Sequence, residues 1–106
     1  PYLVAFAADG ADLVILVKPQ FEAGKAEADK ARGVIRDPEV WRRTLDDATT
    51  ALLAAGAAIM GVMVSPITGG DGNVEFLVHA RAGVVDVDLA SWSQWRDAAV
   101  AAGEGC

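Results

Sequence analysis

The stretch that decides the fold is Asp12-Leu13-Val14-Ile15-Leu16-Val17-Lys18-Pro19-Gln20-Phe21-Glu22, in which five aliphatic residues run directly into a lysine and a proline. An apolar run without alternation is typical of a strand covered on both faces, as in a parallel sheet. Pro19 cannot donate to a sheet ladder, so we expect the strand to end there, with Lys18 at its carboxyl end. That edge of an open α/β sheet is where ligands bind. The alternative is that Lys18 only marks the point where a buried strand reaches water.

The composition indicates one domain that buries part of its surface against something else. Apolar residues make up 53% of the 106 residues, and the mean hydropathy of +0.29 is high for a free-standing domain of this length. The chain opens at Pro1, inside an apolar segment, so we expect a fragment of a longer protein. No run approaches the roughly 20 apolar residues of a membrane span. Cys106 is the single cysteine, which excludes a disulfide framework and a metal site built on cysteine spacing and indicates a cytoplasmic protein.

The net charge of -6 has the wrong sign for a module that holds nucleic acid by itself, because Lys and Arg supply most of the non-specific affinity for phosphate. The cations are nevertheless concentrated in the first half of the chain. Seven of the nine precede residue 44: Lys18, Lys25, Lys30, Arg32, Arg36, Arg42 and Arg43. An anionic ligand could bind to these cations. The alternative is that they belong to an ordinary solvated loop and helix face.

Periodicity and turn residues outline the remaining elements. Asp37-Pro38 is a strong helix start, and an apolar stripe with steps of four and three follows it from Trp41 to Ala55. Ser91 to Gln94 form an S-x-x-Q capping box, which predicts a second helix start. We expect a helix end at 1–8, a strand at 11–18, a long loop at 23–36, a helix at 38–55, strands at 58–65 and 73–81, and a helix at 91–102.

Chain direction brings distant residues together. A strand, helix and strand in one sheet form a right-handed unit with parallel strands, so Lys18 and Ser65 should lie at the same carboxyl edge. The glycine-rich segment 65–73 returns the chain antiparallel, which places Glu75 at that edge too. A carboxylate in an otherwise apolar strand needs a partner, and the Lys18 ammonium is the nearest one expected. A structural salt bridge and a catalytic pair both fit this arrangement.

Three motifs resemble one protein family. Val17-Lys18-Pro19-Gln20-Phe21-Glu22, Gly33-Val34-Ile35-Arg36-Asp37-Pro38, and Ser65-Pro66-Ile67-Thr68-Gly69 with Gly72-Asn73-Val74-Glu75-Phe76 are similar to the C-terminal part of the hemolysin-A-type ribosomal RNA 2′-O-methyltransferases, which carry an FtsJ-like catalytic domain. The resemblance implies an α/β fold, namely the C-terminal portion of a Rossmann-like methyltransferase. Its sheet would have three strands, two parallel and the last antiparallel between them, with helices on the faces.

The resemblance also implies an enzyme with S-adenosylmethionine as methyl donor and a Lys-Asp-Lys-Glu tetrad around the ribose 2′-hydroxyl. Lys18 aligns with the second lysine and Glu75 with the glutamate, so both are predicted to be catalytic. The neighbouring residues predicted to contact substrate are Pro19, Gln20, Ser65 and Asn73.

Several family features have no counterpart in this sequence. The first lysine, the aspartate, the glycine-rich donor loop and the basic N-terminal RNA-binding domain are missing, and Gly70-Asp71 replaces a proline-containing pair. No cofactor-binding or metal-binding residue is therefore predicted here, and the segment alone is expected to be inactive. Ribosomal RNA would bind through the missing N-terminal domain.

One alternative is a non-enzymatic RNA-binding or protein-binding module that uses residues 25–43 and the tryptophan helix. Membrane lysis has little support, because acidic residues flank the last helix. Self-association of the fragment, through an exposed sheet edge or through Trp92 and Trp95, is a further expectation.

Overall fold

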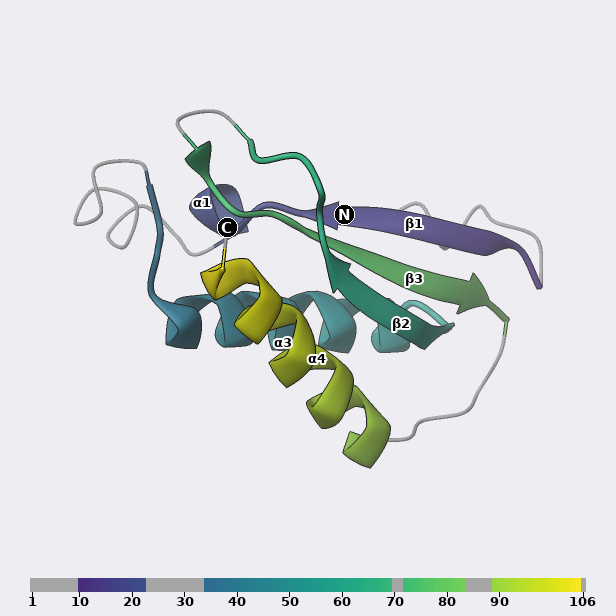
Figure 1. Ribbon diagram of the computed structural model, residues 1–106. Coiled ribbons are helices and arrows are strands. Elements are labelled where there is room, and N and C mark those ends of the chain that lie inside the picture. The colour runs from purple at the N-terminus through teal and green to yellow at the C-terminus, as the bar shows by residue number, and fades with distance from the viewer. Residues whose placement is uncertain (1–9, 23–33, 70–71, 84–88, 106) are drawn as a thin grey trace.

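The structure is a computed structural model that describes residues 10–22, 34–69, 72–83 and 89–105. Its elements in chain order are β1 (Asp12–Val17), α1 (Pro19–Glu22), α3 (Pro38–Ala54), β2 (Ala57–Val64), β3 (Phe76–Ala82) and α4 (Leu89–Glu104) (Figure 1). The helix end expected at 1–8 and the loop residues 23–33 lie outside the described part of the chain. The short helix α1 is not among the expected elements.

The sheet has the strand order β1-β3-β2, and the central strand β3 runs antiparallel to both neighbours. The prediction that the last strand lies between the first two and opposes them is therefore confirmed. β1 and β2 point the same way without pairing with each other. The apolar run of β1 is interpreted above as typical of a parallel sheet, but both strand pairings among the described residues are antiparallel. Such a run reports how a strand is covered and not the direction of its partner.

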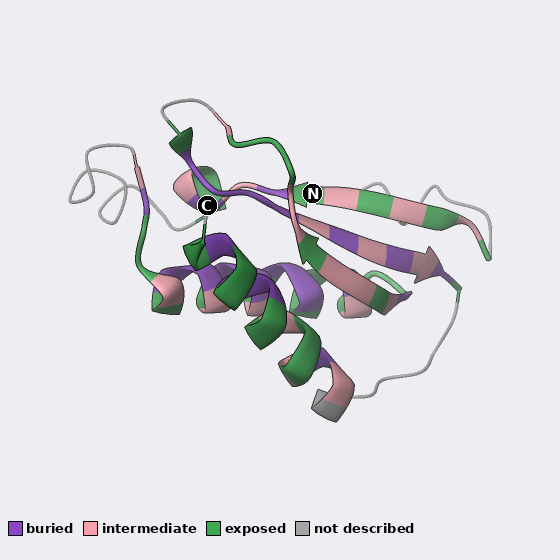
Figure 2. Ribbon diagram, viewed as in Figure 1, coloured by how far each residue is buried: buried purple, intermediate pink, exposed green. Residues whose placement is uncertain are grey.

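The helices α3 and α4 both lie on one face of the sheet, below it in Figure 1. The expectation of helices on both faces is not met by the described residues. β1 alternates accordingly: Val17 is buried against the helices, whereas Val14 and Leu16 are 68% and 44% exposed on the opposite face. Figure 2 shows the same alternation along β1. The prediction that β1 is covered on both faces is therefore wrong for this part of the chain, where no described element lies over Val14 and Leu16.

Helix α3 forms because its first and last residues are capped and its apolar stripe faces the sheet. The Asp37 side chain accepts a hydrogen bond from the Glu39 backbone N–H at 2.9 Å, as an N-cap should. At the other end Gly56 adopts a φ of 93°, a conformation that favours glycine. The Trp41 ring meets the Phe76 ring edge-on at a centroid distance of 5.7 Å, and its indole N–H donates to the Ile35 carbonyl at 3.1 Å. Trp41 thereby ties α3 to the central strand.

Helix α4 begins at Leu89, so Ser91 lies inside the helix and the predicted capping box is wrong. The helix is fixed to α3 by polar contacts at its start: the Trp92 indole N–H donates to Asp46 at 2.9 Å, and the Arg96 guanidinium contacts both Asp46 oxygens. At its end, a Cβ on Gly103 would lie 3.1 Å from Trp41 and from Val74. Glycine fits where α4 crosses the core, whereas a Cβ at this position would press against both side chains.

Because Asp46 joins the two helices, we expect Asp46→Ala to lower the free energy of unfolding by about 1 kcal/mol. The loss is held to this size because the Asp46 and Arg96 side chains are 44% and 20% exposed, so water screens the ion pair. Urea unfolding followed by tryptophan fluorescence measures it. The exposed neighbour Asp47, changed to alanine, is the matched control, and equal effects of the two substitutions would contradict this role for Asp46.

Candidate active site

Three segments meet at one edge of the sheet, as chain direction predicts. Val17 at the end of β1 and Val64 at the end of β2 both pair with Phe76, the first residue of β3. Lys18, Ser65 and Glu75, one residue beyond these three, therefore share that edge. The Ser65 backbone N–H donates to the Glu75 carbonyl at 2.8 Å, which fixes the loop after β2 against the start of β3.

The carboxylate of Glu75 is buried, with 6% of the residue exposed. Its Oε2 accepts a hydrogen bond from the Gln20 side-chain Nε2 at 2.7 Å. Gly69 gives the carboxylate its space: a Cβ built on Gly69 would lie 2.6 Å from the Glu75 carboxyl carbon and closer still to Oε2. Any side chain at position 69 would therefore displace this carboxylate.

Lys18 lies half-buried at the same edge, but its ammonium faces a different group. Lys18 Nζ lies over the Phe21 ring, 5.8 Å from its centroid, within the range of a cation–π contact. Among the described residues no ion pair within 4.0 Å joins Lys18 to Glu75, so the direct pair expected from the sequence is not formed here. The structure brings the two residues to one border of the sheet, and their catalytic roles stay a prediction.

The four residues predicted to contact substrate are mostly engaged with the protein. The Pro19 ring is fully buried, and the Asn73 Oδ1 accepts from the Ile35 backbone N–H at 3.0 Å while Asn73 is 3% exposed. The Ser65 hydroxyl accepts from the Ile67 N–H at 3.3 Å, and Gln20 donates to Glu75. Pro19 and Asn73 thus present almost no surface to a substrate. The structure gives all four residues a part in holding the edge together.

Sequence reasoning missed the contact between Gln20 and Glu75 and the space that Gly69 provides. The short helix α1 begins directly after Lys18, and the Phe21 and Glu22 N–H groups donate to the Lys18 carbonyl. This turn carries Gln20 toward β3. Pro19 at the first helical position is the one local signal that could have indicated a helix there.

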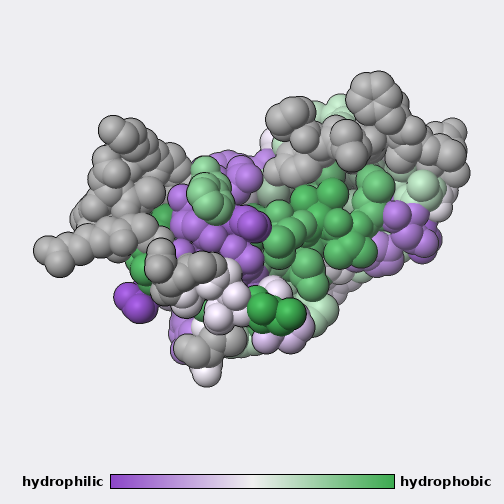
Figure 3. All heavy atoms as spheres, turned by 90° about the horizontal axis from the view of Figure 1, so that it is seen from above, coloured by the Kyte–Doolittle hydropathy of each residue, from purple (hydrophilic) through white to green (hydrophobic). Residues whose placement is uncertain are grey.

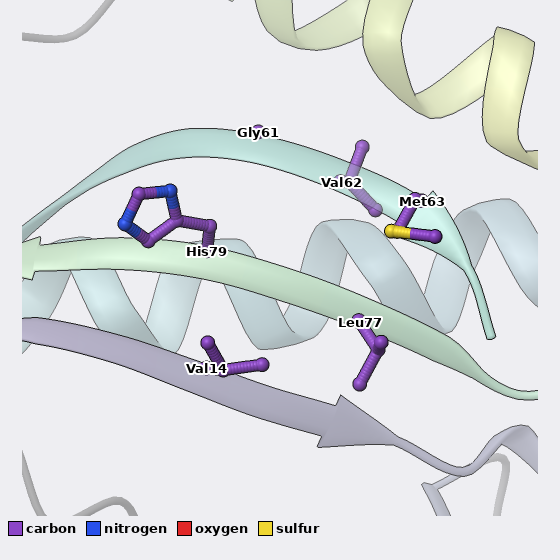
Figure 4. A pocket seen from close by; sticks show the side chains of 6 residues that line it. All are labelled: Val14, Gly61, Val62, Met63, Leu77 and His79. Atoms are coloured by element: carbon purple, nitrogen blue, oxygen red, sulfur yellow. The ribbon is translucent and has the colours of Figure 1, made fainter.

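A second feature is an apolar hollow of about 480 Å³ on the open face of the sheet. It is lined by Val14, Gly61, Val62, Met63, Leu77 and His79, as Figure 4 shows. Seen from above, hydrophobic side chains gather on this face (Figure 3). The hollow is made almost wholly of hydrocarbon, which suits packing and not chemistry.

Polar groups border this face at the start of β1. The Asp12 carboxylate contacts His79 Nε2 at 2.9 Å and accepts from Arg81 Nε at 3.1 Å. The hydrogen bonds with His79 and with Arg81 lower the pKa of Asp12. His79 is therefore placed by a surface carboxylate and lies away from Glu75, since the first three residues of β3 separate the two.

The chain was compared with known proteins. No protein-family model matches it. It is 46% identical over 79 residues to the Bacillus subtilis protein YqxC, named as a candidate rRNA methyltransferase, and 40% identical over 81 residues to the 16S/23S rRNA (cytidine-2′-O)-methyltransferase TlyA of Mycobacterium tuberculosis. Hemolysin A of Brachyspira hyodysenteriae is 38% identical over 66 residues.

These matches cover 74%, 76% and 62% of this chain but only 28%, 30% and 27% of the relatives. The chain thus spans less than a third of the length of each of them. A solved structure of a candidate hemolysin from Streptococcus thermophilus superimposes with a TM-score of 0.80 at 32% identity, over 92% of this chain and 34% of that one.

None of the helices in the described ranges has the length and apolar character that a membrane crossing needs. The sequence relatives and the structural neighbour agree with the resemblance found in the three motifs. The chain is a homologue of the C-terminal part of the hemolysin-A-type rRNA methyltransferases.

Proposed function

We propose that this chain is the C-terminal portion, residues 1–106, of a Rossmann-like, FtsJ-like domain that methylates ribose 2′-hydroxyls of ribosomal RNA with S-adenosylmethionine as donor. The observation that carries the proposal is the meeting of Lys18 and Glu75 at one sheet edge beside the Gly69 turn. The printed names of YqxC and TlyA support the substrate class. Such an enzyme acts in the cytoplasm, and its RNA-binding domain lies outside this chain.

The sequence contains no G-x-G-x-x-G loop. We therefore assign S-adenosylmethionine binding, and the first lysine and the aspartate of the tetrad, to the rest of the parent protein. When bound there, the sulfonium supplies the methyl group. This chain alone is inactive in our proposal.

The part played by this chain concerns the proton of the attacking hydroxyl. A ribose 2′-oxygen forms a bond to carbon only as its proton leaves, and a positioned side chain that takes this proton accelerates such a step. Lys18 is that base, or the cation beside the developing alkoxide. Glu75, buried at the same border, keeps the edge in the geometry that the reaction needs.

The experiment is methyl transfer by the full-length parent to ribosomal RNA, with tritiated S-adenosylmethionine and nuclease digestion of the product. We expect the label in 2′-O-methylated nucleosides, and none when the 106-residue chain replaces the parent. Label in the bases, or no transfer by the parent, would contradict the proposal.

A protein-binding module is the second candidate, and the exposed apolar hollow favours it. Equilibrium dialysis of the parent with S-adenosylmethionine separates the two, since only the enzyme binds the donor. An RNA-binding module without activity is less well supported, because the chain carries a net charge of -6.

We also expect the isolated chain to self-associate through the open face, because apolar surface of this kind is rarely left in water. Trp92 does not contribute, since it is 7% exposed and bound to Asp46. Val14→Lys, in the hollow, should shift sedimentation velocity at high concentration toward the monomer. Ile67→Lys, at a loop residue that is 75% exposed, is the matched control and should behave like the wild type. A monomeric wild type would contradict the expectation.

A further inference from the structure

We propose that Gln20 is a positioning residue, whose side-chain amide holds the Glu75 carboxylate in place at the sheet edge next to Lys18. The inference rests on the proposed function, because it assumes that Glu75 belongs to the catalytic site. It replaces the expectation that Gln20 contacts the substrate.

The first support is the geometry around the carboxylate. Gln20 Nε2 lies 2.7 Å from Glu75 Oε2, a short distance for an N–H···O hydrogen bond, as expected when the acceptor is charged. On another side the carboxylate lies against Gly69, so closely that a Cβ added to Gly69 would collide with it. The carboxylate is thus held between an amide donor and a backbone turn, while the residue is 6% exposed.

The second support is the orientation of the amide. A carboxylate only accepts hydrogen bonds, so the NH₂ group of Gln20 has to face it and the amide oxygen has to point away. In the described part of the structure that oxygen, Gln20 Oε1, is buried and accepts no hydrogen bond. A buried acceptor without a partner is unfavourable, so Oε1 does not select this orientation. The hydrogen bond to Glu75 fixes the orientation of the amide.

The third support is the path of the chain between Lys18 and Gln20. Pro19 is fully buried, and the turn of α1 closes on the Lys18 carbonyl through the N–H groups of Phe21 and Glu22. The Lys18 ammonium and the Gln20 amide are therefore carried by the same short, fixed segment of backbone. The hydrogen bond from Gln20 to Glu75 couples the two catalytic candidates, which are 57 positions apart in sequence and form no ion pair with each other among the described residues.

This arrangement predicts an effect on the chemical step and not on RNA binding. Gln20 acts through a buried carboxylate, so its loss should misplace Glu75 and Lys18 while the RNA-binding surface stays intact. A misplacement of about 1 Å at a reacting centre costs on the order of a hundredfold in rate. We therefore expect kcat to fall while KM for RNA stays the same.

The test uses the full-length parent with ribosomal RNA and S-adenosylmethionine. For Gln20→Leu we expect kcat to fall by about tenfold to a hundredfold, with KM for RNA within about twofold of the wild type. Gln94→Leu is the matched control, since Gln94 is an exposed glutamine on α4, and it should leave both constants unchanged. Retained donor binding in dialysis shows that each variant is folded.

Two further variants keep the inference testable if Gln20→Leu does not fold. Gln20→Glu keeps the shape of the side chain but sets two carboxyl groups together, which then share a proton at low pH. Relative to the wild type at the same pH, its rate should be low at neutral pH and rise as the pH falls, because the shared proton restores a hydrogen bond between the two side chains. Gly69→Ala displaces Glu75 from the other side and should lower kcat in the same way, whereas Gly105→Ala should not, because a Cβ there meets only the Ala102 carbonyl at 3.5 Å.

The possible results separate this inference from the proposed function. A wild-type parent that methylates ribose, together with a Gln20→Leu variant of unchanged kcat, overturns the role of Gln20 alone. A raised KM for RNA with unchanged kcat would show that Gln20 binds substrate, which also overturns it. A wild-type parent without methyl transfer removes the proposed function and this inference with it.

Discussion

Lys18→Ala in the full-length parent is expected to lower the rate of ribosomal RNA methylation by at least about a hundredfold, the contribution typical of a positioned acid–base group. The reason is its place: Lys18 directly follows β1, at the edge where β3 begins and Glu75 is buried. We propose that the donor binds elsewhere in the parent, so the affinity for S-adenosylmethionine should stay close to that of the wild type. Methyl transfer and equilibrium dialysis measure the two quantities separately.

Two controls show what Lys18 contributes. Arginine is never deprotonated in proteins, so Lys18→Arg should be as inactive as Lys18→Ala if the lysine is a base, and partly active if it only stabilises the alkoxide. Arg43→Ala removes an exposed cation of α3 and should leave the rate unchanged. A Lys18→Ala enzyme that methylates RNA at nearly the wild-type rate would refute the assignment.

Trp41→Ala is expected to lower the free energy of unfolding of the isolated chain by about 3–5 kcal/mol, the usual cost of deleting a buried aromatic ring. Trp41 is 3% exposed, contacts Phe76 of the central strand and donates to the Ile35 carbonyl. The substitution leaves a cavity between α3 and the sheet and removes a hydrogen bond. The loss is a large part of the about 5–15 kcal/mol that stabilises a typical domain.

Urea unfolding followed by far-ultraviolet circular dichroism measures this effect without relying on tryptophan emission. Trp95→Ala on α4 is the matched control: Trp95 is 37% exposed, and its replacement should cost clearly less than that of Trp41. Similar losses for the two variants would mean that Trp41 does not hold α3 on the sheet.

Much of the fold can be predicted from local signals. The start of α3 follows from the chemistry of Asp37 and Pro38. The order of the strands is expected from the family resemblance, and chain direction indicates only which strand ends share an edge. The covering of β1 cannot be predicted in this way. Its five aliphatic residues give no alternation, so the sequence does not distinguish a strand enclosed on both sides from one whose second face has no described neighbour.

In the candidate site, too, some features could be predicted from the sequence and others could not. That Lys18 and Glu75 share an edge is a consequence of topology, which the sequence indicates. Their actual contacts depend on one turn of helix and on side-chain rotamers. The sequence therefore could not predict that Gln20, and not Lys18, contacts the Glu75 carboxylate. The role of Gly69 depends likewise on a distance between a loop and a side chain.

The position of β3 has a consequence for synthesis on the ribosome. Within the described residues β1 and β2 do not pair with each other, and each is hydrogen-bonded only to β3, Phe76–Ala82. A nascent chain that has not yet exposed this segment therefore carries two apolar strands that lack the partner they have in the described structure. Such strands attract other chains, so translation that stalls before residue 76 should leave an aggregation-prone product.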